Sequence, residues 1–291
     1  MAMQRYLQLF IEVSRLKNIK PVMMLFLPCL WGLMLAFSHR ISVSAMFYAA
    51  IVFFVGSVAA RSFGCIINDI MDRDIDRLVE RTKNRPIARG DLTILEAAAM
   101  SLIWLALGFC CLIIFNITAK YFILGGLFIG SLYPLAKRFV KVPQVVLGVC
   151  FNIGVLVGYA AVHKDISYAA AMLYVSGFYW TMFYDTIYAI QDVADDRKIG
   201  VNSAVIHYGE NLGKKLVTFV AMSVGANIST GVLISAPWFF YIFSFLILSF
   251  FVAMFAKLAD GKEANYQKIF ELNSLVGVLI LIQIFLSRVY A

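Results

Sequence analysis

The chain has 291 residues, of which 62% are hydrophobic and 14% are charged, and its mean hydropathy is +0.84. This composition leaves too little polar surface to cover a water-soluble globule, so it indicates an integral membrane protein. The formal net charge of +8 is typical of lysine and arginine retained on the cytoplasmic side of a membrane. We therefore expect membrane lipid as a partner and no nucleic acid.

Nine apolar stretches are long enough to form membrane-spanning helices of about 20 residues. They predict an all-α integral membrane protein, a helical bundle around a lipid-facing cavity, in a single domain over 1–291. With the N-terminus inside, 20 of the 25 basic residues fall in inner segments, which predicts an N-in, C-out orientation. The expected spans are 20–38, 43–67, 93–116, 119–136, 142–162, 167–189, 213–234, 237–257 and 267–288.

Two inner loops, 68–92 and 190–212, hold ten of the 17 acidic residues. If the second helix continues into the first loop, then Asp69, Asp72 and Asp76 share one helical face, and Asp74 points elsewhere. Asn68 adds an amide oxygen beside them. Carboxylates clustered without histidine or cysteine favour a hard cation, and magnesium in particular combines one or two carboxylates with waters and substrate phosphates.

The second loop repeats this arrangement, because a continuous helix would place Asp185, Asp192 and Asp196 on one face with Tyr188 between them. Asp192 and Asp196 each follow a carboxylate of the first loop by 120 residues. This equal spacing indicates a diverged internal duplication, whose two halves face each other across a cavity. The two repeats would cover about 20–136 and 142–257, followed by a ninth helix at 267–288.

Basic residues accompany the acids, with Arg81 and Arg85 after the first acidic run and Lys137 and Arg138 in a later inner loop. The planar fork of arginine suits phosphate oxygens, so acids, magnesium and arginines together indicate a diphosphate site. The apolar body behind that site suits the tail of a polyprenyl diphosphate. An allylic carbocation formed from it would need aromatic faces nearby, for which the candidates are Phe63, Tyr133, Phe151, Tyr184 and Tyr188.

The chain resembles the UbiA superfamily of intramembrane aromatic prenyltransferases. Within it, the details resemble the branch that prenylates 4-hydroxybenzoate in ubiquinone biosynthesis. The resemblance implies transfer of a polyprenyl group to the ring carbon ortho to the phenol, with release of diphosphate. It rests on NDxxDxxxD at Asn68–Asp76, RTxNRPI at Arg81–Ile87, YPxxKRxxxxPQxxLG at Tyr133–Gly148 and YDTxYAxxDxxDDxxxGxxS at Tyr184–Ser203.

The resemblance also implies roles for individual residues. Arg15 or Arg138 would bind the acceptor carboxylate, and Asp185 or Asp192 would polarise the acceptor phenol. The chain departs from the family after Arg15, where Lys17-Asn18-Ile19 replaces a DKP-like triplet. The implied magnesium ligands are Asp69, Asp72, Asp76, Asp192 and Asp196, and the implied substrate-binding residues are Asn68, Arg81, Arg85, Lys137, Arg138, Arg15, Tyr133, Tyr188 and Ser203.

Two other functions remain open from the sequence. One is a sister prenyltransferase with homogentisate or a naphthoate as acceptor, and the other is an ion-coupled transporter. The lack of an arginine- and serine-rich presequence favours a bacterial inner membrane, and a mature mitochondrial protein would have the same appearance. Among the remaining polar and small residues, Asn152 either lines the cavity or joins two helices. We expect close helix packing at Gly126 and Gly130 and at Gly154 and Gly158.

Overall fold

The computed structural model of the chain describes residues 2–38 and 42–290, and all regular secondary structure in those residues is helical. Arg40, one of the five basic residues that the predicted topology does not place in inner segments, lies outside the described residues. The long helices are α2 (Lys20–Leu35), α3 (Val43–Met71), α5 (Ile94–Leu112), α6 (Ile117–Ser131), α8 (Gln144–Ala160), α9 (Tyr168–Ala189), α12 (Leu212–Leu233), α13 (Trp238–Ala259) and α14 (Glu263–Val289). The other elements are α1 (Ala2–Val13), α4 (Arg73–Asp76), α7 (Tyr133–Phe139), η1 (Ile190–Asp192), α10 (Val193–Ile199), α11 (Ala204–Tyr208) and η2 (Gly209–Asn211).

Each expected span coincides with one of the long helices, or with the pair α6 and α7, which meet at 49°. In the described chain, five stretches are long and apolar enough to cross a membrane, or six if α6 and α7 form one bent span. Helices α2 and α8 are apolar but have only 16 and 17 residues. The all-helical membrane architecture is therefore confirmed, whereas the count of nine spans and the orientation stay predictions.

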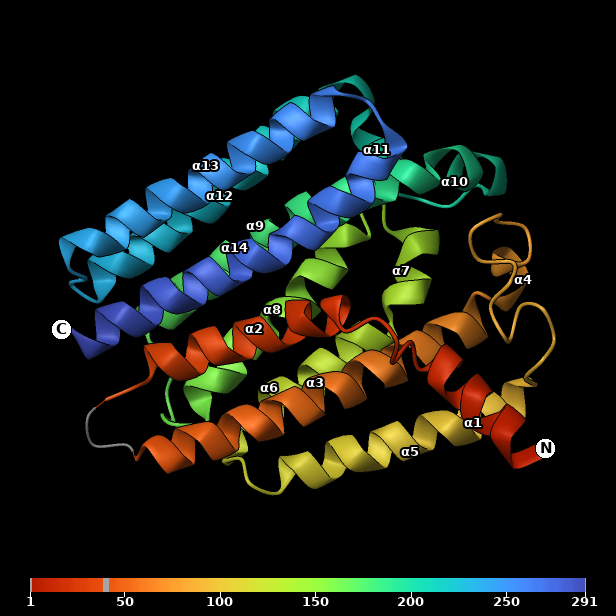
Figure 1. Cartoon of the computed structure of the whole chain (residues 1–291), viewed down its shortest axis with the longest axis horizontal. Coiled ribbons are helices and arrows are strands. Elements are labelled where there is room, and N and C mark those ends of the chain that lie inside the picture. The colour runs from red at the N-terminus through yellow and green to blue at the C-terminus, as the bar shows by residue number, and fades with distance from the viewer. Residues whose placement is uncertain (1, 39–41, 291) are drawn as a thin grey trace.

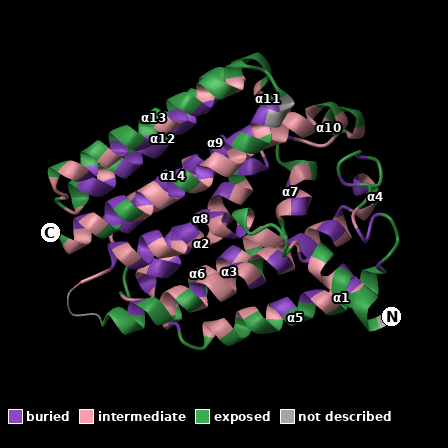
Figure 2. Ribbon diagram, in the orientation of Figure 1, coloured by how far each residue is buried: buried purple, intermediate pink, exposed green. Residues whose placement is uncertain are grey.

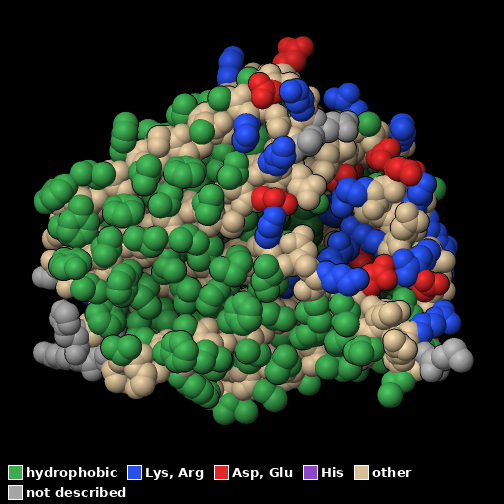
Figure 3. All heavy atoms as spheres, in the orientation of Figure 1, with side chains coloured by type: hydrophobic (Ala, Val, Ile, Leu, Met, Phe, Trp, Pro, Cys, Tyr) green, Lys and Arg blue, Asp and Glu red, His purple; other side chains and the backbone are tan. Residues whose placement is uncertain are grey.

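The polar parts of the molecule gather at one end of the bundle. In Figure 1 the long helices run side by side, and the short helices α4, α7, α10 and α11 lie together at the end that also carries α1. Charged side chains crowd this same end in Figure 3, while the rest of the visible face is apolar. In Figure 2 the outer helices α5 and α13 are largely exposed. An apolar exposed band beside one charged end is what a bilayer requires of a helical protein.

Several helices begin at a side chain that caps their first turn. Ser42, Asn116 and Ser167 each accept a hydrogen bond from the backbone N–H three residues on, at the starts of α3, α6 and α9. Thr93 and Glu96 form a capping box at the start of α5. Because the first backbone N–H groups of a helix have no partner within it, these caps fix where the chain enters each helix.

Glycines bring α2 and α8 into backbone contact. A Cβ atom on Gly158 would lie 2.0 Å from the carbonyl oxygen of Cys29, and one on Gly32 would lie 1.9 Å from that of Val155. Gly154 also faces Cys29, so the expected packing face at Gly154 and Gly158 is confirmed. In a membrane, where burying apolar surface gives helices little reason to associate, such close packing is a main source of attraction between them.

Asn152 joins α8 to α9. Its side chain is fully buried, and its Nδ2 donates to the carbonyl oxygen of Gly148 at 2.9 Å and to the hydroxyl of Thr181 at 2.8 Å. Gly177 leaves the space for this amide, since a Cβ there would lie 2.3 Å from Asn152 Oδ1. Of the two roles that the sequence left open, Asn152 therefore has the one between helices.

The glycine contact predicts a specific sensitivity. We expect Gly158→Ala to lower the free energy of unfolding by about 1–3 kcal/mol, because the added methyl group forces α2 and α8 apart. Gly225→Ala is the matched control, since a Cβ at Gly225 in α12 meets nothing within 4 Å; it should be neutral or slightly stabilising. Thermal unfolding in detergent measures both variants. Equal melting temperatures would contradict the packing role of Gly158.

Candidate active site

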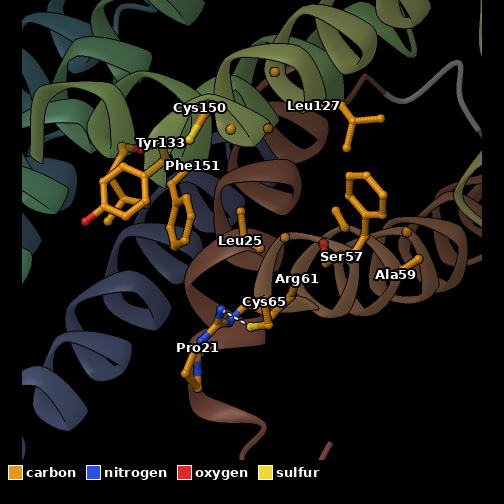
Figure 4. Close-up of a pocket in the computed structure, with 18 of the residues that line it drawn as sticks. Pro21, Leu25, Ser57, Ala59, Arg61, Cys65, Leu127, Tyr133, Cys150 and Phe151 are labelled. Atoms are coloured by element: carbon orange, nitrogen blue, oxygen red, sulfur yellow. Dashed lines mark hydrogen bonds between the residues drawn. The ribbon is translucent and has the colours of Figure 1, made fainter. Parts of the chain in front are cut away.

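A cavity of about 490 Å³ runs from the charged end of the molecule into the helix bundle. Figure 4 shows side chains of α3 on one side, and of α6, α7 and α8 on the other, pointing into the space between them. Asn68 lines the cavity near the charged end, and Phe53 lines it 15 residues earlier in the same helix. At 1.5 Å per residue, these positions are about 22 Å apart. The cavity therefore has a polar mouth and a long apolar interior.

The first acidic cluster lies at the mouth. Helix α3 ends at Met71 and α4 begins at Arg73. The continuous helix from which we derived the spacing of this motif is therefore broken at Asp72. Even so, Asp69, Asp72 and Asp76 are all at most 6% exposed. The Asp74 side chain is 88% exposed. Three carboxylates thus turn inward and the fourth turns out, as the spacing predicted.

Arginine side chains connect the buried carboxylates. Arg85 Nη1 donates to Asp69 Oδ1 at 3.0 Å and to Asp76 Oδ2 at 2.7 Å. Arg15 Nη2 donates to the same Asp69 oxygen at 2.6 Å. Burial raises the pKa of Asp76, and the adjacent Arg85 opposes that shift by favouring the charged form. Arg85 and Arg15 therefore compensate much of the negative charge of this cluster.

Two further cations approach Asp72 from α7. Lys137 Nζ lies 3.5 Å from Asp72 Oδ2 and 5.2 Å from the centre of the Tyr133 ring. Arg138 Nη2 lies 3.6 Å from Asp72 Oδ1 and donates to the carbonyl oxygen of Met71 at 2.8 Å. Lys137 and Tyr133 line the cavity, whereas Arg138 is not among its lining residues.

The second acidic motif meets the first loop through one bidentate ion pair. Arg81 donates from Nε and Nη2 to the two carboxylate oxygens of Asp192, at 2.8 and 2.7 Å. Its guanidinium carbon also lies 5.8 Å from the centre of the Tyr188 ring. The two acidic loops, 111 residues apart at this contact, are thus joined at the mouth of the cavity.

The second motif is not one continuous helix, which corrects our expectation. Helix α9 ends at Ala189, η1 follows, and α10 begins at Val193. Asp185 in α9 lines the cavity, whereas Asp192 lies in η1 at the break and Asp196 lies in α10. Burial and, to a lesser extent, the neighbouring carboxylate of Asp192 together raise the pKa of Asp196 to about 6. Ser203 is not among the lining residues; it is buried, and its hydroxyl caps α11 by accepting a hydrogen bond from the N–H of Ile206.

The donor set at the mouth fits a hard cation held jointly with a ligand. Within residues 2–38 and 42–290, no three histidine, cysteine, aspartate or glutamate side chains converge on one point. A self-contained metal cage is therefore not formed by this part of the chain. Magnesium commonly takes one or two carboxylates and completes its shell with water and phosphate oxygens, and buried aspartates beside arginines suit that arrangement.

One cavity residue was missed by the sequence reasoning. Arg61 lies in the membrane-spanning part of α3 and lines the cavity, where it donates a hydrogen bond to Cys65 Sγ (Figure 4). It has no ion-pair partner in the described part of the chain. A lone arginine in an apolar helix was visible in the sequence. Since charged side chains inside membranes are costly and usually functional, it was a signal for a site.

Known proteins share this architecture. The sequence profile described as the UbiA prenyltransferase family matches residues 25–279. A 4-hydroxybenzoate octaprenyltransferase of Francisella tularensis is 30% identical over 96% of this chain and 97% of its own. A mitochondrial 4-hydroxybenzoate polyprenyltransferase of Aedes aegypti is 34% identical over 92% of this chain and 60% of its own.

Solved structures show the same fold. A UbiA homologue from Aeropyrum pernix has a TM-score of 0.77 and 24% identity, covering 92% of this chain and 98% of its own. A UbiA homologue from Archaeoglobus fulgidus, bound to GPP and Mg²⁺, has a TM-score of 0.75 and 19% identity, covering 97% and 99%. With the profile matching most of its length, this multi-pass membrane protein belongs to the UbiA prenyltransferase family.

Proposed function

We propose that the protein transfers a polyprenyl group from polyprenyl diphosphate to 4-hydroxybenzoate, in the inner membrane of a bacterium. The observation that carries this proposal is the apolar cavity whose mouth joins carboxylates and cations of both acidic loops. Such a cavity suits a lipid with a diphosphate head. The names of the Francisella and Aedes relatives support 4-hydroxybenzoate as the acceptor.

The diphosphate would lie at the mouth, held by Arg81, Arg85 and Lys137 with Asn68 beside them. All four side chains line the cavity. Magnesium, when bound, would neutralise the charge that develops on the departing diphosphate. The residues that would hold it are Asp69, Asp72, Asp76, Asp192 and Asp196.

The reaction breaks the allylic carbon–oxygen bond, and its electron pair leaves with the diphosphate. The ring carbon ortho to the phenol then supplies the electrons of the new carbon–carbon bond, and loss of its proton restores aromaticity. Tyr133 and Tyr188 place aromatic rings at the cavity wall, where they would face the positive charge. Asp185 also lines the cavity, whereas Asp192 is engaged by Arg81. This favours Asp185 as the residue that polarises the phenol.

The acceptor carboxylate requires a cation inside the cavity. Of the two arginines that we expected, Arg15 pairs with Asp69, and Arg138 contacts Asp72 and the Met71 carbonyl. Arg61 lines the cavity without a carboxylate partner in the described residues. We therefore assign the acceptor carboxylate to Arg61, because a partly buried guanidinium without a carboxylate partner is free to form a charged hydrogen bond to an anionic ligand.

The acidic residues predict loss of turnover on substitution. Asp72→Ala and Asp192→Ala should each lower the rate by about a hundredfold or more, since each removes a carboxylate that would hold the magnesium needed to neutralise the departing diphosphate. Asp74→Ala is the matched control and should keep activity, because Asp74 is exposed. Labelled 4-hydroxybenzoate incorporated into lipid by membranes holding equal amounts of each protein measures the effect. Full activity of Asp72→Ala or Asp192→Ala would refute the mechanism.

The donor set also predicts dependence on a divalent cation. Excess EDTA should abolish the transfer, and Mg²⁺ added beyond the chelator should restore it. The assay is the same incorporation of labelled acceptor in washed membranes. Activity that persists in EDTA would argue against a role for the carboxylates as metal ligands.

The acceptor assignment predicts a change confined to one substrate. In Arg61→Met, KM for 4-hydroxybenzoate should rise roughly 10- to 100-fold, because a charged hydrogen bond is lost. KM for the prenyl diphosphate should stay the same. Phenol, which lacks the carboxylate, is the control acceptor and should be used equally by both proteins. An equal rise in KM for phenol in Arg61→Met would show that Arg61 does not bind the acceptor carboxylate.

Sister acceptors are tested in the same assay. Unlabelled 4-hydroxybenzoate should compete with the labelled acceptor, whereas homogentisate and a naphthoate should compete poorly. Stronger competition by either of those would assign the protein to a sister reaction with the same donor.

A further inference from the structure

Helix α1 ends in a turn that usually requires glycine. The N–H of Leu16 bonds to the carbonyl of Ile11, and the N–H of Arg15 bonds to the carbonyl of Glu12. This pattern is a Schellman motif, in which the residue after the cap adopts the left-handed conformation and is most often glycine. Here that residue is Arg15, with φ of 53°. An arginine in this position strains the backbone, so the surrounding structure must hold it there.

Ser14, the residue before Arg15, is fixed by two other helices. It is 1% exposed, and its hydroxyl accepts a hydrogen bond from Trp104 Nε1 of α5 at 2.8 Å. Its carbonyl oxygen accepts from the hydroxyl of Ser62 in α3 at 3.2 Å. Phe10, one turn earlier in α1, stacks on the Trp104 ring at 5.4 Å. The end of α1 is thus fastened to α3 and α5 directly beside the strained residue.

The strained residue presents its side chain to the mouth of the cavity. Arg15 lines the cavity, and its Nη2 donates to Asp69. Its Nε is buried and has no hydrogen-bond partner in the described chain. A buried, unpaired N–H next to the acidic cluster is available to an oxygen of a bound anion.

We propose that Trp104 is a positioning residue for the diphosphate site, acting through Ser14 on Arg15. The hydrogen bond from Trp104 holds Ser14, which keeps Arg15 in the left-handed conformation that directs its guanidinium to the mouth. Arg15 itself binds a diphosphate oxygen rather than the acceptor. This inference rests on the proposed function, since it assumes that the ligand at the mouth is a diphosphate.

The test is the affinity for inorganic pyrophosphate in the presence of Mg²⁺, measured by calorimetry on the detergent-solubilised protein. Pyrophosphate has no tail, so contacts of Trp104 with the apolar cavity do not contribute. Trp104→Phe keeps the stacked ring and removes the N–H donor. The loss of one hydrogen bond should raise Kd about three- to tenfold. Trp238→Phe, at an exposed position in α13, is the matched control and should leave Kd unchanged.

A double substitution separates positioning from general destabilisation. In the Arg15→Ala background, Trp104→Phe should have no further effect on Kd, because Trp104 acts only through Arg15. Ser14→Ala, which leaves the tryptophan intact, should reproduce the effect of Trp104→Phe. The same increase in Kd with and without Arg15 would overturn the proposal, as would unchanged affinity in both Trp104→Phe and Ser14→Ala.

The backbone strain has its own signature. Arg15→Gly and Arg15→Ala lose the same guanidinium and should bind pyrophosphate equally weakly, but the glycine variant should unfold at a higher temperature. Equal unfolding temperatures would contradict the claim that the turn is strained.

If the proposed acceptor is wrong but this inference is right, pyrophosphate binding would follow the predicted pattern and 4-hydroxybenzoate would not be prenylated. A wild-type protein that does not bind pyrophosphate would overturn the diphosphate site and this inference together.

Discussion

The pairing of buried carboxylates with arginine and lysine is the interaction on which the polar end of this molecule depends. Asp69, Asp72 and Asp76 are almost completely buried, and an unpaired charge in such a place destabilises a protein by about 3–5 kcal/mol. The partners come from distant parts of the chain. Arg85 follows the motif, Arg15 follows α1, and the α7 cations reach Asp72. Satisfying three carboxylates therefore draws α1, α7 and the first acidic loop together around the cavity mouth.

The helices of the apolar part of the molecule are held together by a different kind of interaction. Lipid surrounds it, so burying apolar side chains gives little attraction between helices, and close packing with hydrogen bonds must supply it. Gly32, Gly154 and Gly158 allow α2 and α8 to touch along their backbones, and Asn152 ties α8 to α9. With these helices packed on one side, α3 and α6 stand on the other sides of the cavity. Such a closely packed wall fixes the position of the cavity mouth relative to the apolar interior.

The sequence predicted the helices and the acidic residues because both leave local patterns. Apolar runs located every long helix, and the spacing of Asp69, Asp72 and Asp76 predicted which carboxylates turn inward while Asp74 turns out. It did not predict the breaks at Asp72 and at 190–192, because several polar residues in succession are compatible with a continuous or a broken helix. The pair between Arg81 and Asp192 spans 111 residues, a contact that tertiary packing alone determines. Arg61 carried a local signal, but its place on the cavity wall depends on how α3 faces α6.

The paired charges also bear on how the proposed site would receive its ligands. A diphosphate alone brings negative charge to carboxylates, and a magnesium ion alone brings positive charge to arginines. Each would have to separate ion pairs that already satisfy one another. A magnesium diphosphate complex carries both signs, so its metal can take carboxylate oxygens while its phosphates take the arginines that those carboxylates release. The network therefore favours joint binding of metal and diphosphate, and it resists either ion alone. Because Arg81 joins the two loops through Asp192, such an exchange would act on both acidic motifs at once.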